Sequence, residues 1–281
     1  MWGTNPEMDL EALSIATETL FILLAALVID GLTGNIKQLR RIVPHPASVL
    51  AAMVSWLELK LNRSQRSNYA RLIRGLMVAT VVVCSGVAAG WLVVVISAKV
   101  PFGWLIAMLA VNVLVAQRGP FDEVRNNVRV LRSNNLQRAR DAAVEFLGPA
   151  AATADENTIV REAANHLASL FLLGLVAAVF WFVLLGIPGL FAWRAINVMG
   201  RLLDASDPRL VYFGWVPTRL NDVIAYLPSL IAGLLIVAAA AFLPVASPLR
   251  ALRVMLRDGS KHRSLRLGSP VAAMAGRLES P

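Results

Sequence analysis

The sequence predicts an all-α membrane protein with about five transmembrane helices. Four long stretches carry no charged side chain, and they cover Gly75–Ala98, Val100–Gln117, Ala163–Trp193 and Val223–Leu249. An α-helix needs about 20 apolar residues to cross a bilayer, and a soluble domain has no reason to repeat runs of this length. The formal net charge is +9. Because Lys and Arg gather in cytoplasmic loops of membrane proteins, this charge indicates orientation rather than nucleic-acid binding.

A further span is predicted near the N-terminus, where the uncharged centre Thr19–Ile29 is flanked by Glu18 and Asp30. Acidic residues stand where a secretory signal would carry basic ones, so this segment is not interpreted as a cleaved leader. The predicted spans lie near residues 14–34, 75–98, 100–117, 165–187 and 223–247.

Charge predicts the sides of the membrane. Residues 37–74 hold eight Lys or Arg against one acid, and the tail 250–281 holds seven against two. The first 18 residues hold four acids and no basic residue. The positive-inside rule therefore predicts a protein of the bacterial cytoplasmic (inner) membrane with its N-terminus outside and its C-terminus inside. In this topology the nearly balanced loop 194–222 lies outside.

Two further segments are predicted to be helical but not to span. Ala47–Leu61 is too short to cross and is expected in the membrane interface or as a surface helix against the core. Residues 118–162 form a cytoplasmic helical excursion, and Asp155 is the expected N-cap of the helix that continues into the long apolar run. No repeat or linker divides the chain, so residues 1–281 are interpreted as one integral-membrane domain.

Few polar residues could carry chemistry at membrane depth, where ionisable groups are costly and usually functional. Asp30, Arg194 and Asp222 are candidates, and Arg219 could pair with Asp222 at i,i+3 spacing. Pro188 ends a helix or lines a pocket. The tail residues that suggest an anion or phospholipid-headgroup patch, or an ordinary positive-inside anchor, are Arg257, Asp258, Lys261 and His262. The three histidines lack ligand partners at metal-site spacing, so no metal centre is predicted.

Several collinear stretches resemble one known family. Phe213–Pro228 is similar to a Phe-Gly-Trp-x-x-x-Arg-Leu-Asp-Asp-…-Pro pattern, and Gly186–Asn197 to Gly-x-Pro-Gly-…-Tyr-Arg-Ala-x-Asn. Asp30-Gly31, His45-Pro46 and the tail after Arg257 follow in the same order. The family is that of the integral-membrane adenosylcobinamide-phosphate synthases of cobalamin biosynthesis. The resemblance adds Asn197 to the catalytic candidates and His45 to the cofactor-binding ones.

The resemblance implies ATP-dependent amide formation between an aminopropanol-type amine and adenosylcobyric acid, with ATP and Mg²⁺ required if that activity is retained. The family carries its carboxylates in Glu-Ser-x-x-Glu-Asn-x-x-Asp-Gly. The corresponding residues here are neutral, namely Asn165, His166, Ser169, Leu170, Leu173 and Gly174. Loss of one electrostatic stabiliser typically costs about 10²–10³ in rate.

Three functions therefore remain open. The chain is a catalytically degenerate family member that acts as a membrane subunit or scaffold, an active ligase with a rearranged site, or a regulatory inner-membrane protein. The expected partners are the lipid bilayer and other membrane subunits, with a corrinoid only if the family function is retained and no nucleic acid. Whether the chain is an enzyme is not decided by the sequence.

Overall fold

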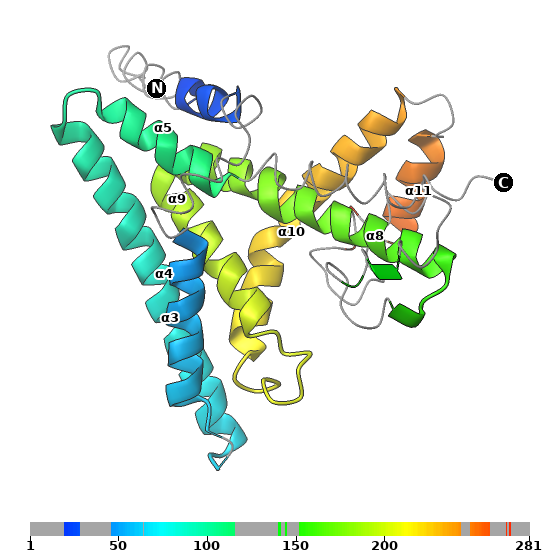
Figure 1. Cartoon of the computed structure of the whole chain (residues 1–281), viewed down its shortest axis with the longest axis horizontal. Coiled ribbons are helices and arrows are strands. Elements are labelled where there is room, and N and C mark those ends of the chain that lie inside the picture. The colour runs from blue at the N-terminus through cyan, green and yellow to red at the C-terminus, as the bar shows by residue number, and fades with distance from the viewer. Residues whose placement is uncertain are drawn as a thin grey trace, which may run out of the picture. The chain divides into compact units, whose positions relative to one another are not determined.

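The computed structural model describes residues 20–28, 46–63, 65–115, 140–141, 144, 152–242, 248–258, 268 and 270. Every regular element that it describes is helical, which confirms the predicted all-α class (Figure 1). The elements are α3 (Pro46–Leu61), α4 (Asn68–Lys99), α5 (Gly103–Leu114), α8 (Glu156–Leu170), the π-helix η2 (Phe171–Val176), α9 (Ala177–Leu202), α10 (Trp215–Ala240) and α11 (Pro248–Asp258).

The chain forms two compact units, which are described separately below. One consists of Met1–Ala116 with Ala178–Thr218, and the other of Gln117–Ala177 with Arg219–Pro281. Neither unit is a continuous stretch of sequence, and the single domain over residues 1–281 stays a prediction.

Three of the described helices are long and apolar enough to cross a membrane: Asn68–Lys99, Thr158–Leu202 and Trp215–Ala239. The span predicted near 100–117 is only the 12-residue α5, about 18 Å long, whereas the hydrocarbon core measures about 30 Å. Of the first predicted span, residues 20–28 are described and form a helix. The membrane character of the chain is thus supported, with three candidate spans among the described residues rather than five.

Glycines of α4 set the helix packing of the first unit. A Cβ added at Gly90 would lie 2.5 Å from the Cα of Pro188, and one added at Gly86 would lie 2.9 Å from the Cβ of Ala195. Gly75, nearer the start of α4, faces the backbone carbonyl of Phe213 in the same way. The Gly86–Gly90 spacing is the small-xxx-small pattern that lets membrane helices approach backbone to backbone. Helix α4 therefore runs antiparallel to the chain segment that follows Pro188.

The long apolar run is broken at Gly186, whose φ of 65° and ψ of −154° are not helical. Glycine adopts this backbone conformation without the steric cost that a Cβ imposes. Helix α9 resumes around Pro188, because proline needs no N–H in the first turn of a helix. The predicted interruption is therefore present, but residues 194–202 continue as helix where a loop was predicted. The connection between α9 and α10 is residues 203–214.

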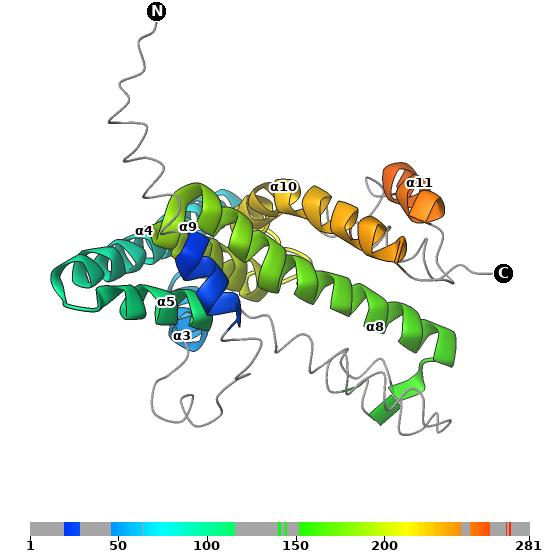
Figure 2. The same cartoon turned by 90° about the horizontal axis from the view of Figure 1, so that it is seen from above.

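Helix α3 lies beside α4 (Figures 1 and 2). Val54 is fully buried, whereas Trp56 and Leu59 are exposed. The Lys60 ammonium lies 4.0 Å from the centroid of the Trp56 ring. Aromatic and basic side chains together are typical of a membrane–water interface. Of the two predicted positions for this helix, the structure shows packing against α4, and its outer face retains an interfacial composition.

In the second unit, Asp155 occupies the N-cap position of α8, as predicted. Its carboxylate accepts a hydrogen bond from the Thr158 hydroxyl. Farther along, Leu172 and Val176 of η2 form an apolar cluster with Ala232 of α10. Met255 of α11 packs with Ile236 in a second cluster. Apolar contacts therefore attach both α11 and the π-helical segment to α10.

Candidate functional site

One turn of α9 carries two of the predicted site residues, Arg194 and Asn197, and brings them together with Trp193. Trp193 is 1% exposed and Asn197 is 2% exposed. Residues three and four apart lie on the same side of a helix, so these three side chains share one turn. This turn lies in the first unit, beyond the break at Gly186.

Arg194 contacts the end of α5. Its Nε donates a hydrogen bond to the backbone carbonyl of Leu114, the last residue of that helix. The final carbonyls of a helix have no partner within the helix and carry the negative end of its dipole, so a guanidinium stabilises them. The structure therefore gives this catalytic candidate a positioning role, in addition to any contact with a ligand.

The two neighbours of Arg194 on this turn hold unpaired donors. The Trp193 Nε1 and the Asn197 Nδ2 are buried and have no hydrogen-bond partner among the described residues. A buried donor without a partner costs about 1–3 kcal/mol, so native proteins keep few of them. Sequence reasoning missed Trp193, because tryptophan in a membrane protein is usually explained by the interfacial belts.

A second group of candidates lies at the start of α10. The Arg219 Nη1 and the Asp222 Oδ2 are 4.0 Å apart, as the predicted i,i+3 pair requires, with side chains 58% and 7% exposed. At this distance and exposure, an ion pair contributes little stability. Between them lies Asn221, which is completely buried and whose two amide atoms both lack a described partner. The family pattern has aspartate at this position, a signal that was present in the sequence.

The positions that the resemblance assigns to carboxylates lie on α8 and η2. The Asn165 Nδ2 donates to the Glu162 carboxylate at 3.5 Å, and the Ser169 hydroxyl donates to the Asn165 carbonyl at 2.8 Å. Leu173 packs against the apolar cluster of Leu172 and Ala232. These side chains therefore serve the helix and its packing.

The remaining predicted site residues are only partly described. Asp30, His45, Lys261 and His262 lie outside the described residues. Arg257 is exposed in the last turn of α11, and Asp258 ends this helix.

A divalent cation was tested against the donor set. The described part of the chain contains no group of three or more His, Cys, Asp or Glu residues that could hold a metal ion. The described residues thus do not fit a Mg²⁺ site, and no reaction step is assigned to one.

Comparison with known proteins shows the family. Residues 23–280 match the family model described as CobD/Cbib protein. A Sinorhizobium sp protein named cobalamin biosynthesis protein CobD is 35% identical over 270 residues, which cover 94% of this chain and 82% of the relative. Relatives of the same name from Brucella anthropi and Rhizobium meliloti are 33% and 31% identical, over 92% and 93% of this chain and 80% and 81% of their own lengths.

No solved structure matches the chain. The family match and the similarity to these relatives extend over most of the chain, including both the α9 turn and the start of α10. The chain therefore belongs to the CobD/Cbib family, the cobinamide-phosphate synthase family that its motifs resemble.

Proposed function

We propose that this chain is a membrane protein of the cobalamin-biosynthesis pathway that has lost amide-ligase catalysis and acts as a membrane subunit or scaffold. The pathway follows from the relatives, which are named cobalamin biosynthesis proteins. Loss of catalysis is supported by the site itself.

The observation that carries the proposal is the position of Leu173. The resemblance assigns an aspartate here, and in this chain the residue packs on an apolar cluster of η2 and α10. A carboxylate at this place would need a hydrogen-bonded or aqueous environment, because an unpaired buried charge is strongly unfavourable. The apolar packing supports a site that has closed over the position where a charged group would act.

The framework around the lost groups is retained. The segment Phe171–Val176 is π-helical, a geometry that is rare and is found mostly at functional sites. Asn221 replaces a family aspartate and is buried without partners for its amide. A π-helix and an orphaned amide both cost stability, so they support descent from a working site whose chemistry was later lost.

The cytoplasmic membrane of a bacterium is the proposed location. The basic segment 37–74 is proposed to lie inside, on the positive-inside rule. The side of each terminus is considered with the hydrogen bonds around Arg209 in the Discussion.

The test is a direct assay of the detergent-purified protein beside the Sinorhizobium relative. Both are incubated with ATP, Mg²⁺, adenosylcobyric acid and aminopropanol phosphate, and products are measured by mass spectrometry. We expect amide product from the relative and none from this chain above a no-enzyme control. Product from this chain would overturn the proposal and establish the alternative, an active ligase with a rearranged site.

The subunit role is tested separately by purification from membranes under native conditions. We expect other proteins of corrinoid synthesis to co-purify, and deletion of the gene to lower corrinoid production. A chain that is inactive, has no such partner and leaves corrinoid levels unchanged on deletion would instead favour the regulatory inner-membrane function.

A further inference from the structure

The turn of α9 at residues 193–197 presents donors. The unpaired atoms of Trp193 and Asn197 are both nitrogens that carry hydrogen, and Arg194 between them is a cation. The indole Nε1 can only donate, and a guanidinium has five N–H donors and no acceptor. The natural complement of this set is a group that accepts hydrogen bonds and carries negative charge.

The arrangement of the donors narrows the ligand further. Trp193 and Asn197 lie one helical turn apart on one face, and Arg194 is about 100° further round the helix axis. Donors thus approach from two directions, which suits a tetrahedral oxyanion. A planar carboxylate pairs with a guanidinium in a single plane. Arg194 is held in place by the carbonyl of Leu114, so part of the site is formed in advance.

We propose that Trp193, Arg194 and Asn197 form a binding site for a phosphate group. This site goes beyond the scaffold role, because it gives the chain a ligand whether or not catalysis survives. The phosphate belongs to a soluble small molecule or to a lipid headgroup, and the two sources share the same recognition chemistry.

The test uses the full-length protein in nanodiscs of zwitterionic phosphatidylcholine, with inorganic pyrophosphate as the soluble probe. Binding is measured with radiolabelled pyrophosphate and by the shift in the midpoint of thermal unfolding. The test variant combines Trp193→Phe with Asn197→Leu, which removes both unpaired donors and keeps the size of the side chains. The matched control is Arg201→Gln, which removes an exposed positive charge farther along the same helix.

We expect the double variant to bind pyrophosphate at least about tenfold more weakly, a change of about 1.4 kcal/mol. Its unfolding midpoint without ligand should be unchanged or higher, because unpaired donors have been removed. Arg201→Gln should bind within about twofold of the wild type. A structural role for the two donors would instead lower the midpoint without ligand, and such a loss with binding intact would overturn the proposal.

A second set of nanodiscs contains phosphatidic acid and no pyrophosphate. Stabilisation of the wild type but not of the double variant in these discs would identify the source as a lipid headgroup. If neither probe distinguishes the wild type from the double variant, the phosphate site is excluded. That result leaves the proposed loss of catalysis untouched, since the latter depends only on the product assay.

Discussion

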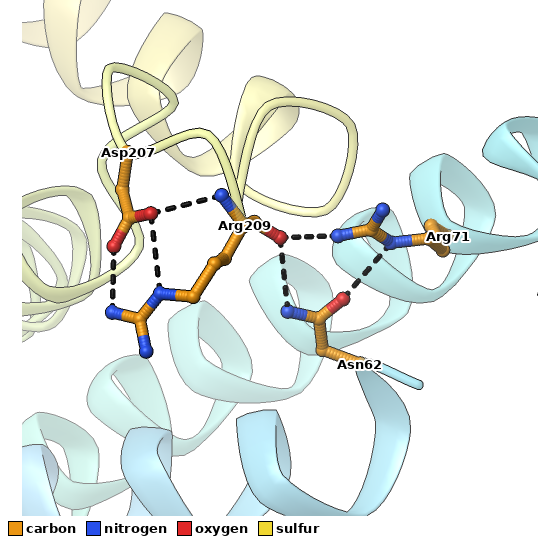
Figure 3. A network of polar contacts seen from close by, with 4 residues as sticks. All are labelled: Asn62, Arg71, Asp207 and Arg209. Carbon is orange, nitrogen blue, oxygen red and sulfur yellow. Dashed lines mark hydrogen bonds and ion pairs between the residues drawn. The ribbon is translucent and has the colours of Figure 1, made fainter. Parts of the chain in front are cut away.

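The guanidinium of Arg71 donates a hydrogen bond to the backbone carbonyl of Arg209, joining the first turn of α4 to the connection between α9 and α10 (Figure 3). Asn62 donates to the same carbonyl at 3.4 Å and accepts from the Arg71 Nε at 3.0 Å. Because α4 is long and apolar enough to cross the membrane, its first turn and residues 203–214 lie on one side. The predicted topology had placed 37–74 inside and 194–222 outside, and these bonds correct it.

Cysteine labelling tests this correction. The chain has a single cysteine, Cys84, so a Cys84→Ala background reports only on introduced thiols. We expect Gln65→Cys and Ser206→Cys, both at exposed positions, to react with a membrane-impermeant maleimide from the same side. Lys99→Cys, at the far end of α4, should react from the opposite side. Labelling of positions 65 and 206 from different sides would contradict the hydrogen bonds in Figure 3.

The same experiment decides the side of the C-terminus. If residues 203–214 are cytoplasmic, a single crossing by α10 carries the basic tail 250–281 outside, against the positive-inside rule. A cytoplasmic C-terminus and a membrane-crossing α10 thus exclude each other in this topology. Ser280→Cys distinguishes the two, because labelling from the side of position 206 means that α10 does not cross.

A pH dependence is predicted for the same loop. The side chain of Arg209 donates to Asp207, at 2.7 Å in the ion pair, and this hydrogen bond lowers the pKa of the Asp207 carboxyl below 3.8. The folded pKa is therefore below the unfolded one, so the pair stabilises the fold above about pH 4 and this contribution is lost as the pH falls through the folded pKa. The unfolding midpoint, measured from about pH 6 to about pH 3, should fall more steeply in the wild type than in Asp207→Asn. Equal slopes would show that the pair does not stabilise the loop.

The sequence predicted the helical class because uncharged runs record which segments lie in lipid. It did not predict the side of residues 203–214, for a physical reason. The region 194–222 holds four Arg against three Asp, so the charge rule gives no preference. The bonds that fix its side go to a backbone carbonyl, which every residue has. No side-chain pattern could therefore reveal them.

The candidate site was partly predictable for a related reason. Charged and motif residues such as Arg194 and Asp222 are visible in the sequence at membrane depth. The unpaired indole of Trp193 is not, since the lack of a partner depends on packing alone. The continuation of α9 after Pro188 was also hidden, because a proline that stops one helix is equally suited to begin the next.

Close packing of α4 on α9 makes Gly90 sensitive to substitution. A Cβ at Gly90 would lie within 3.1 Å of three backbone atoms of residues 187 and 188, none of which can rotate away. We expect Gly90→Ala to lower the free energy of unfolding by roughly 1–3 kcal/mol, as overpacking typically does. The control is Thr80→Ala on the exposed side of α4, where a change within about 0.5 kcal/mol is expected. Equal thermal stability of the two variants would contradict the close approach.

Restoring a carboxylate at position 173 tests whether the former site has closed. Because Leu173 packs on apolar side chains of η2 and α10, Leu173→Asp should destabilise the protein by about 2.5–3.5 kcal/mol, the usual cost of an acid at the centre of a membrane helix. Leu173→Asn has the same shape without the charge and separates the loss of packing from the cost of ionisation. Asn165→Glu, at a partly exposed position, should change stability little.

Thermal unfolding of these variants at neutral pH gives the comparison. If Leu173→Asp is no less stable than Leu173→Asn, the carboxylate has water or a cationic partner at this position. The site would then still be open to charged groups, and the argument that apolar packing replaced its chemistry would fail. A large difference between the two would mean that regaining the lost carboxylates requires repacking of η2 against α10, because the charge has no solvating group there.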